Sequence, residues 1–453
     1  MIISMPDPII IIGGGIAGMA AAWRLIPTGL PVTLLEARPR LGGRLDSLRA
    51  AGAPTPFDNG PHLFLSSYVR TRRLLREIGL ERDFDYPWPG RLPVIGPQGR
   101  AAILWEWPLP APFNFSAGLL SFPLLSWKAR NRAVLAARDL LTGPLEAEVS
   151  AAQWLEAHGE AEERGLFWEP LVRAALNAPS EAVPVRDLQV ILREGFAKGL
   201  TGGRLGHARR PLGKIFGEGM RRALEEAGVQ VLTGHTVGGA EITAGRITSV
   251  KLRNGRSLPC RAVVAALPPW ALYDWLRTLP HPTPLVAPLH LEAWGAQSLV
   301  SLFLWAGQRP WVEPWTSLPG RRAAWVFDYT RLWGDSRAPL GLILEWPDLP
   351  QSQTAAAMRG FVAREILPEL AAALPQLSRV PWRAWKLVRE RRATPLRPRA
   401  LWGHPLSPTT ALPNLVLAGD WLDPLLPPTV EAAVRSGEAA GEKIIMQKIA
   451  LDK

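Results

Sequence analysis

Apolar runs separated by turn residues dominate the two ends of the chain. Near the N-terminus, the run Ile9–Ile12 is followed by glycines, a small-residue stretch of helical character and a second apolar run, PVTLLE. This order predicts strand, tight turn, helix and strand, which is a complete βαβ unit. Near the C-terminus, LVLAGD predicts a buried strand that ends on Gly-Asp, and the proline pair in WLDPLLPPTVEAAV marks the start of a helix.

The middle of the chain predicts both helices and strands. Helical patterns cover residues 68–78, 213–227 and 359–374, and a turn at Asn254 and Gly255 predicts a hairpin before the buried strand in AVVAALPP. Alternating runs such as SLVSLFLW, AAWVFDY and GLILEW predict a sheet in the region that holds more than half of the tryptophans. One face of this sheet either lines an apolar cavity or packs into an ordinary core.

Three glycines in the turn of the βαβ unit, Gly13, Gly15 and Gly18, complete the spacing G-x-G-x-x-G. Gly13 permits the turn, Gly15 leaves room for a pyrophosphate, and Gly18 lets the helix pack closely on the strand. The helix N-terminus offers free N–H groups and the positive end of its dipole to the phosphates. Glu36 ends the second strand and can accept from ribose hydroxyls, so the pattern predicts a bound dinucleotide, either FAD or NAD.

A second glycine pair follows in ARPRLGGR. Here Arg38, Gly43 and Arg44 either form an ordinary turn or lie against the same phosphates, with Arg44 as a charge-assisted donor. The phrases GGGIAG and LLEARPRLGGR resemble the flavin-binding start of the amine oxidase and carotenoid desaturase superfamily. The resemblance implies that the dinucleotide is FAD.

The same resemblance implies roles for residues far along the chain. In DNGPH, Gly60 would let the backbone approach the flavin ring, and the strand ending near Val237 would present its backbone to the adenine. The closing segment resembles the superfamily's last FAD motif, in which the aspartate contacts the ribityl or pyrophosphate region and the helix N-terminus points at the flavin. The cofactor residues implied in this segment are Gly419, Asp420, Thr429 and Val430. A Gly-Asp turn with no ligand is the alternative.

These patterns predict an α/β fold. We expect a Rossmann-like FAD-binding domain of the amine oxidase type, with a mixed α+β substrate domain inserted into it. The FAD-binding domain would be discontinuous, over residues 1–85, 205–268 and 386–453, and the substrate-binding domain would span 86–204 and 269–385. At 453 residues the chain is long enough for two cores.

Two phrases are more distinctive than the cofactor motifs. WEPLVRAALNAP and DNGPHLFLSSY resemble the hydroxysqualene dehydroxylases of bacterial squalene and hopanoid synthesis. The resemblance implies that an allylic hydroxyl is removed from a C30 isoprenoid alcohol, hydroxysqualene, giving squalene and water with hydride from reduced FAD. An acid must help the water leave, and the candidates are Glu169, His62 and Asp423. His62 is explained equally well as a hydrogen-bonded turn residue, and most of the stretch around Glu169 has the helical spacing of structural residues.

Other functions remain open at this point. A carotenoid-type desaturase acting on phytoene or diapophytoene, or an isomerase, would use the same flavin site. A non-catalytic relative that binds prenyl groups would keep the fold without tight FAD. The sequence lacks a second G-x-G-x-x-G between a strand and a helix, so we expect the electron donor for FAD to be a separate, unidentified partner.

The net charge of +12 and the single cysteine narrow the range of partners. The basic residues are mostly arginine and are scattered, with no basic block interleaved with stacking aromatics, which argues against nucleic acid. Cys260 alone forms neither an internal disulfide nor a Cys-rich metal site, so no metal is predicted.

Residues 86–145 are rich in proline and tryptophan and contain an apolar run too short to span a bilayer. The helix predicted from KARNRAVLAARDLL either packs on the core of the substrate domain or lies at a membrane surface, with Lys128, Arg130 and Arg132 facing lipid headgroups. The apolar N-terminal stretch lacks the preceding basic region of a signal peptide. We therefore expect a cytoplasmic protein that makes peripheral contact with the inner face of the cell membrane.

Overall fold

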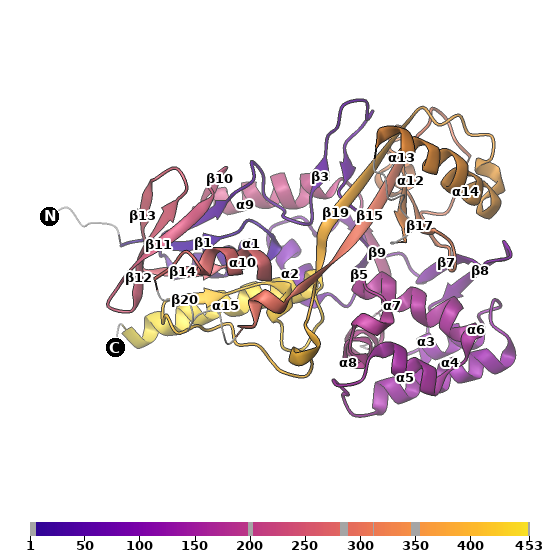
Figure 1. Cartoon of the computed structure of the whole chain (residues 1–453), viewed down its shortest axis with the longest axis horizontal. Helices are drawn as coiled ribbons and strands as arrows, with labels where there is room; N and C mark the ends of the chain where they lie inside the picture. Colours follow the sequence, from indigo (N-terminus) through magenta and orange to yellow (C-terminus); the bar gives the residue numbers. More distant parts are fainter. Residues whose placement is uncertain (1–5, 198–202, 281–288, 311, 346–353, 452–453) are drawn as a thin grey trace.

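The computed structural model describes the chain except for residues 1–5, 198–202, 281–288, 311, 346–353 and 452–453. The molecule is elongated, as Figure 1 shows, and the two ends of the chain lie at the same end of it, around one sheet. Two inner parts of the chain, around residues 91–196 and 295–396, form a second sheet and a group of helices at the opposite end, while the part between them returns to the first sheet.

A parallel sheet of five strands forms the core of the first region, in the order β10-β2-β1-β14-β20. Its strands are β1 (Ile9–Ile12), β2 (Val32–Glu36), β10 (Gln230–Thr233), β14 (Ala262–Ala265) and β20 (Leu415–Leu417). Every neighbouring pair in it is parallel. The predicted βαβ unit and the two buried strands predicted later in the chain are thus confirmed, and they join one sheet.

The isoleucine run of β1 is explained by cover on both faces of this sheet. Ile9 and Ile11 point into one core, and Ile10 and Ile12 point into the other. Each such side chain stabilises the fold by about 1.5–3 kcal/mol, because a parallel sheet buried on both sides leaves no face for water. The helices on the first face are α1 (Ile16–Leu25), α9 (Met220–Glu226) and α15 (Val430–Leu451).

The second face is covered by a small antiparallel sheet and one helix. They are β11 (Val237–Thr243), β12 (Arg246–Leu252), β13 (Ser257–Pro259) and α10 (Pro269–Leu276). The hairpin predicted at Asn254 and Gly255 joins β12 to β13, and Gly255 takes the positive φ of +88° that the turn requires. The helix predicted over 213–227 is also present, as a π-helical turn (Gly213–Gly219) that runs into α9.

A mixed sheet of seven strands forms the second region, in the order β19-β15-β18-β17-β16-β7-β8. Its strands are β7 (Arg91–Ile95), β8 (Ala101–Trp105), β15 (Gly295–Trp305), β16 (Trp315–Ser317), β17 (Ala323–Asp328), β18 (Leu340–Leu344) and β19 (Ala384–Leu396). The three alternating runs singled out in the sequence are β15, β17 and β18, so the predicted sheet is confirmed. Three further helices belong to this part of the chain: α12 (Tyr329–Trp333), α13 (Ala355–Phe361) and α14 (Leu367–Ala373).

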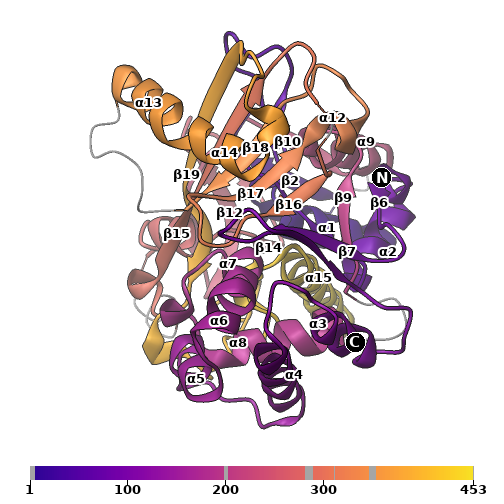
Figure 2. The same ribbon diagram turned by 90° about the vertical axis from the view of Figure 1, so that its right-hand side faces the viewer.

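A group of helices lies below this sheet in the view of Figure 2. They are α3 (Phe113–Leu120), α4 (Trp127–Thr142), α5 (Ala151–His158), α6 (Ala161–Glu163), α7 (Glu169–Leu176) and α8 (Val185–Val190). Short pairings link the two regions, formed by β3 (Ser47–Leu48), β4 (Phe57–Asp58), β5 (Phe64–Leu65), β6 (Phe84–Asp85) and β9 (Leu205–Ala208). Helix α2 (Val69–Glu77) matches the helix predicted over 68–78 within one residue at each end.

The packing shifts two of the expected domain boundaries. Strand β19 crosses the boundary expected at 386, because its whole length to Leu396 pairs with β15 in the seven-stranded sheet. Residues 269–294 lie beyond the boundary expected at 268, yet Trp275 and Trp294 pack into the core of the five-stranded sheet. Because Trp275 and Trp294 are buried in that core, the segments that carry them pack with the first region.

Helix α4 packs on a core, which is the first of the two alternatives left open by the sequence. Arg130 donates to the carbonyls of Leu125 and Leu120, and Arg132 pairs with the buried Glu163 at 2.8 Å, so both arginines hold neighbouring helices in place. Of the three residues expected to face lipid, only Lys128 lies exposed without an ion pair among the described residues. No helix within the described part of the chain combines the length and the hydropathy needed to cross a membrane.

Candidate active site

One cavity of about 1830 Å³ extends from the glycine turn of the first region to the sheet and helices of the second. It is larger than the roughly 300–1,000 Å³ of a site for a single small ligand, so it has room for two. Twelve of the sixteen residues predicted to bind the cofactor or to act in catalysis line its wall: Gly13, Gly15, Glu36, Arg38, Gly43, Arg44, His62, Glu169, Gly419, Asp420, Thr429 and Val430.

The three glycines of the turn differ in what surrounds them. A Cβ atom on Gly13 would lie 2.4 Å from the carbonyl oxygen of Ala266, and one on Gly18 would lie 2.0 Å from the carbonyl oxygen of Gly13. A Cβ on Gly15 would meet nothing within 4 Å. Gly13 and Gly18 are therefore required by the protein's own packing, whereas Gly15 borders open space in the cavity, as a site for a phosphate requires.

Glu36 holds the glycine turn and the following loop together. Its Oε2 accepts from the Gly14 N–H at 2.7 Å, and its Oε1 accepts from the Arg38 N–H at 2.7 Å. A carboxylate has about four acceptor sites, so the two bonds leave capacity for ribose hydroxyls. Next to Glu36, the backbone N–H groups of Gly234 and His235 donate to the carbonyls of Arg38 and Glu36.

Arg44 connects three segments at the centre of the cavity wall. It donates to the Asp420 carboxylate at 2.8 Å and to the Ala393 carbonyl of β19 at 3.1 Å. Burial alone would lower the pKa of this guanidinium, but the charges of Asp420 and Glu390 outweigh it and raise the pKa above its usual value. A permanent cation thus faces the place where a pyrophosphate would lie.

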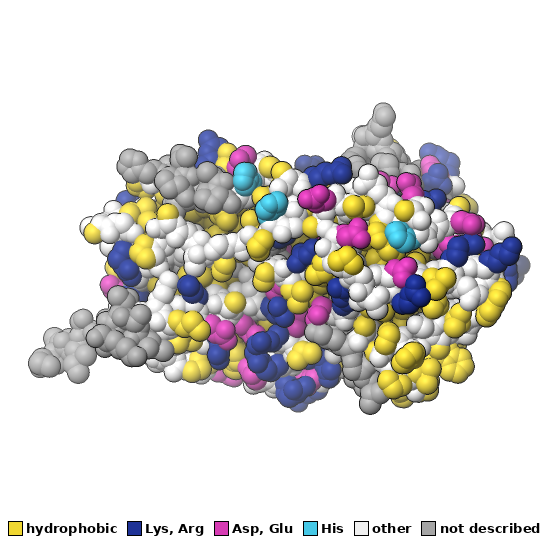
Figure 3. Space-filling model, turned by 90° about the horizontal axis from the view of Figure 1, so that it is seen from below, with side chains coloured by type: hydrophobic (Ala, Val, Ile, Leu, Met, Phe, Trp, Pro, Cys, Tyr) yellow, Lys and Arg dark blue, Asp and Glu magenta, His cyan; other side chains and the backbone are white. Residues whose placement is uncertain are grey.

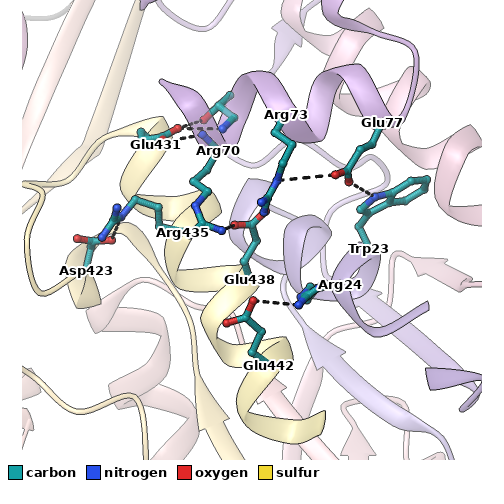
Figure 4. A network of polar contacts seen from close by, with 11 residues as sticks. Trp23, Arg24, Arg70, Arg73, Glu77, Asp423, Glu431, Arg435, Glu438 and Glu442 are labelled. Atoms are coloured by element: carbon teal, nitrogen blue, oxygen red, sulfur yellow. Dashed lines mark hydrogen bonds and ion pairs between the residues drawn. The ribbon is translucent and has the colours of Figure 1, made fainter. Parts of the chain in front are cut away.

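The start of α15 is anchored from outside its own helix. Thr429 caps it by accepting from the Ala432 N–H at 3.1 Å. Glu431 accepts from the N–H groups of Arg70 and Thr71 at 2.8 and 2.9 Å, and so caps the first turn of α2 (Figure 4). Arg70 and Arg73 of α2 pair in turn with Glu438. This network fixes the N-terminus of α15 toward the cavity, where its dipole favours negative charge.

His62 lines the cavity with its tautomer determined by its neighbour. Its Nδ1 lies 2.7 Å from the Gly60 carbonyl, which only accepts, so Nδ1 carries the proton and Nε2 has a free lone pair in the neutral ring. Burial lowers the pKa of His62; the Gly60 carbonyl opposes that effect and the charge of Arg44 adds to it. The ring is therefore neutral near pH 7.

Glu169 is the carboxylate that α7 presents to the cavity. Its Oε1 accepts a short hydrogen bond from the Ser180 hydroxyl, and its Oε2 is buried with no hydrogen-bond partner. The Nε of Arg173 lies 4.0 Å from Oε2, which is an ion-pair distance without a hydrogen bond. At the other end of α7, Asn177 takes a left-handed φ of 49° and donates to the Thr394 hydroxyl of β19 at 3.1 Å.

Four predicted residues do not line the cavity: Gly18, Gly60, Val237 and Asp423. The close approach at Gly60 is that of Leu299, whose Cδ2 would lie 2.7 Å from a Cβ there. Val237 begins β11 instead of ending a strand, because the chain turns at Gly234 with a φ of +74°. Asp423 accepts from two backbone N–H groups and from Arg435 at 2.8 Å, so its position argues for a structural role instead of that of an acid.

Sequence reasoning missed Glu106, which also lines the cavity. It accepts from Asn114 at 3.1 Å, and its Oε2 is buried with no partner. Burial raises its pKa, while the Asn114 N–H and the charge of Arg204 act in the opposite direction. Its place in the WEWP phrase, amid prolines and tryptophans, gave no periodic signal that would have separated it from a loop residue.

The far end of the cavity is apolar. Side chains of five strands and of three helical stretches form much of its wall: Leu92, Leu104, Phe115, Phe122, Leu166, Phe167, Leu171, Phe196, Leu299, Trp325, Phe327 and Ile343. Trp325 and Phe327 belong to β17, so one face of the seven-stranded sheet lines the cavity. Trp305 and Trp315 belong to the same hydrophobic cluster but do not line the cavity, so the tryptophan-rich region serves both purposes.

Four features together define a dinucleotide-binding protein of the Rossmann type. They are the open space for a phosphate at Gly15, the carboxylate of Glu36 available to a ribose, the guanidinium of Arg44 and the N-terminus of α15. All of these groups face one cavity, so they fit a single FAD. The sequence matches the family described as flavin containing amine oxidoreductases over residues 16–445. The chain therefore belongs to that family, and it is an FAD-dependent oxidoreductase.

Individual relatives support this assignment. A hydroxysqualene dehydroxylase of Rhodopseudomonas palustris is 27% identical over 97% of this chain and 99% of its own. A probable zeta-carotene desaturase of Synechococcus elongatus is 27% identical over 42% of each chain. Among solved structures, an oxidoreductase from Methanosarcina mazei superposes with a TM-score of 0.70 and 17% identity, covering 96% of this chain and 100% of that one.

Proposed function

We propose that this protein removes an allylic hydroxyl from hydroxysqualene, a C30 isoprenoid alcohol, to give squalene and water. The observation that carries the proposal is the continuous cavity of about 1830 Å³, which joins the cofactor groups to a wall of large apolar side chains, with charged side chains such as Glu106, Glu169 and Arg173 between them. A long isoprenoid fits such a wall, since its only polar group is the one that reacts. The hydroxysqualene dehydroxylase relative, aligned over almost the whole chain, supports the same choice.

The reaction requires a hydride, a proton and a dry pocket. FAD in its reduced form supplies the hydride to the allylic carbon. The carbon–oxygen bond breaks as the carbon–hydrogen bond forms, and the leaving hydroxyl takes up a proton and departs as water. The residues of this chain have to supply that proton, orient the hydroxyl and exclude bulk water.

We assign the proton to Glu169. Its Oε1 accepts from Ser180, and its buried Oε2 has no hydrogen-bond partner, so Oε2 is the oxygen that can bond to a molecule in the cavity. His62 suits a different task. The neutral ring, with Nδ1 held by the Gly60 carbonyl, offers the Nε2 lone pair as an acceptor that can orient the substrate hydroxyl.

The apolar wall would protect the carbon that loses the hydroxyl. Trp325 and Phe327 line the cavity, and an aromatic ring whose face meets the allylic carbon would stabilise positive charge that develops there. Close-packed aromatic and aliphatic side chains also keep water from competing for that carbon.

The test is anaerobic incubation of the purified protein with chemically reduced FAD and hydroxysqualene, with squalene measured by gas chromatography and mass spectrometry. Squalene that forms in proportion to enzyme, and that falls at least about 100-fold in Glu169→Gln, supports the proposal. Absence of squalene with fully bound, reduced flavin would contradict it. A chemical reductant is used because the natural electron donor is a separate partner that this experiment does not need.

A second candidate is a carotenoid-type desaturase, which the relative from Synechococcus favours over part of the chain. It would run the flavin chemistry in the opposite direction, with hydride taken from a saturated carbon–carbon bond of a polyene. Incubation of the oxidised protein with phytoene or diapophytoene separates the two, since only a desaturase would then produce more conjugated products.

A further inference from the structure

Large apolar side chains stand exposed at the far end of the cavity. We name this surface the aromatic rim; it consists of Trp88, Trp105, Trp107, Leu109, Phe113 and Trp127. Phe113 and Trp127 are 65% and 67% exposed, which is unusual for residues of this size. Figure 3 shows hydrophobic side chains gathered at the end of the molecule that carries β7, β8 and α3. A patch of this kind marks a surface that meets another apolar phase.

The rim is one continuous surface, although its residues come from several segments. The Glu106 N–H donates to the Gly90 carbonyl, which brings the loop of Trp88 beside β8. The Trp107 indole donates to Ser121 at 3.0 Å, which fixes it on the end of α3. Arg130 of α4 donates to the Leu120 carbonyl at the same end of α3, so Trp127 follows closely.

The rim borders the cavity. Trp105 belongs to both, since it is 37% exposed and also lines the cavity wall. Helix α3 has the same two sides: Phe113 is exposed, and Phe115, two residues further on, lines the cavity. The apolar side chains of the rim therefore continue into the cavity wall at Trp105 and along α3.

Cations and carboxylates both lie around the rim: Arg91 is paired with Glu313 at 2.5 Å, and Glu162 accepts from Ser126, the residue before Trp127. The guanidinium of Arg204 lies 5.5 Å from the ring centre of Trp88, and that of Arg91 lies 5.7 Å from Trp105. Lys128 follows Trp127 directly and is exposed. Tryptophan with cations beside it is typical of the interface of a bilayer, where the rings lie at headgroup depth and the cations meet phosphates. Protein partners are also bound by tryptophan, but they do not require apolar side chains that continue into a cavity.

We propose that the aromatic rim docks this protein on the surface of a lipid bilayer that contains anionic lipid, and that the isoprenoid substrate enters the cavity from the lipid at this point. The second half of this statement rests on the proposed function; the first half does not. Phe113 and Trp127 would insert into the interface, and Lys128 with the arginines would contact phosphate groups.

The test is flotation of the flavin-loaded protein with vesicles of phosphatidylcholine containing about one third phosphatidylglycerol. The variant Phe113→Ser/Trp127→Ser should lower the partition coefficient at least about tenfold. The matched control is Leu145→Ser/Met446→Ser, because these two side chains are 43% and 65% exposed and lie outside both the rim and the cavity wall. The control should bind within twofold of the wild type, and the flavin spectrum shows that each variant is folded.

Three results would overturn the proposal: no flotation of the wild type, equal flotation of the rim variant, or an equal loss in the control. A wild-type dimer that the rim variant converts to a monomer, without vesicle binding by either, would instead assign the rim to a second copy of the chain. Flotation needs no turnover, so a protein that binds vesicles but forms no squalene would contradict the proposed reaction while leaving the docking surface in place.

Discussion

The two ends of the cavity are built in opposite ways. At the cofactor end, the wall consists of backbone at Gly13 and Gly15 and of fixed charges such as Arg44 and Asp420. At the far end it consists of apolar side chains from many separate segments. Where backbone packs directly on backbone, as at Gly13, an added Cβ is not tolerated, whereas an apolar wall can exchange one side chain for another of similar volume. The cofactor end is therefore rigidly specified, and the substrate end is open to variation.

The largest effect is expected in the glycine turn. Gly18→Ala places a Cβ 2.0 Å from the Gly13 carbonyl oxygen, so α1 must move away from β1. We expect a loss of about 1–3 kcal/mol in unfolding free energy and purification without flavin, measured by chemical denaturation and by absorbance. Gly15→Ala is the matched control, because its Cβ meets no protein atom within 4 Å.

Gly15→Ala should keep the unfolding free energy of the wild type and lower the affinity for FAD at least about tenfold, or about 1.4 kcal/mol. The two alanines then separate packing from cofactor binding. An equal loss of unfolding free energy in both variants would contradict the open space beside Gly15.

The next effect distinguishes the two carboxylates. Glu169→Gln should lower turnover about 100-fold or more with an unfolding free energy within about 0.5 kcal/mol of the wild type. Asp423→Asn should do the reverse: the amide puts a donor against Arg435, which costs about 1–3 kcal/mol, while turnover stays within a few-fold. Steady-state kinetics and denaturation on both variants check this, and a large loss of turnover in Asp423→Asn alone would return Asp423 to the candidate acids.

A smaller effect is expected in the pH dependence of the protein's stability, through Asp58 of β4. Burial raises the pKa of Asp58 to about 7, while hydrogen bonds from Ser47 and the Leu212 N–H act against it. An unfolded aspartate titrates near 3.9, so the folded protein binds the proton more tightly; this stability is complete at low pH and is lost as pH rises through about 7. Asp58→Asn stays neutral, so its melting temperature relative to the wild type should rise between about pH 4 and about pH 7. A constant difference across this window would contradict the assignment.

The smallest effect is expected at the apolar end. Phe327 is 3% exposed and lines the cavity among other large side chains. Phe327→Leu should raise KM a few-fold, cost about 1–2 kcal/mol in unfolding free energy and leave flavin content unchanged. A loss of flavin in this variant would mean that the two ends of the cavity are not independent.

Much of the fold was open to prediction, for reasons that differ by segment. β1, α1 and β2 follow from apolar periodicity and glycine spacing, since their interactions are local in sequence. The alternating runs correctly predicted β15, β17 and β18. The packing of Trp294 and β19 across the boundaries predicted at 268 and 386 was not visible in the sequence, because their packing partners lie far away in the chain.

The sequence by itself determined the dinucleotide turn, the strands that carry it and, through Arg44 and the closing Gly-Asp segment, the flavin. These features depend on which residue types can adopt a given backbone conformation, and that preference is a local property of each residue. Only the tertiary structure decided which carboxylate faces the cavity. Arg44 and Asp420 meet across 376 residues and Asn177 and Thr394 across 217, and no local pattern reports whether a side chain such as Glu169 or Asp423 ends in a cavity or against an arginine.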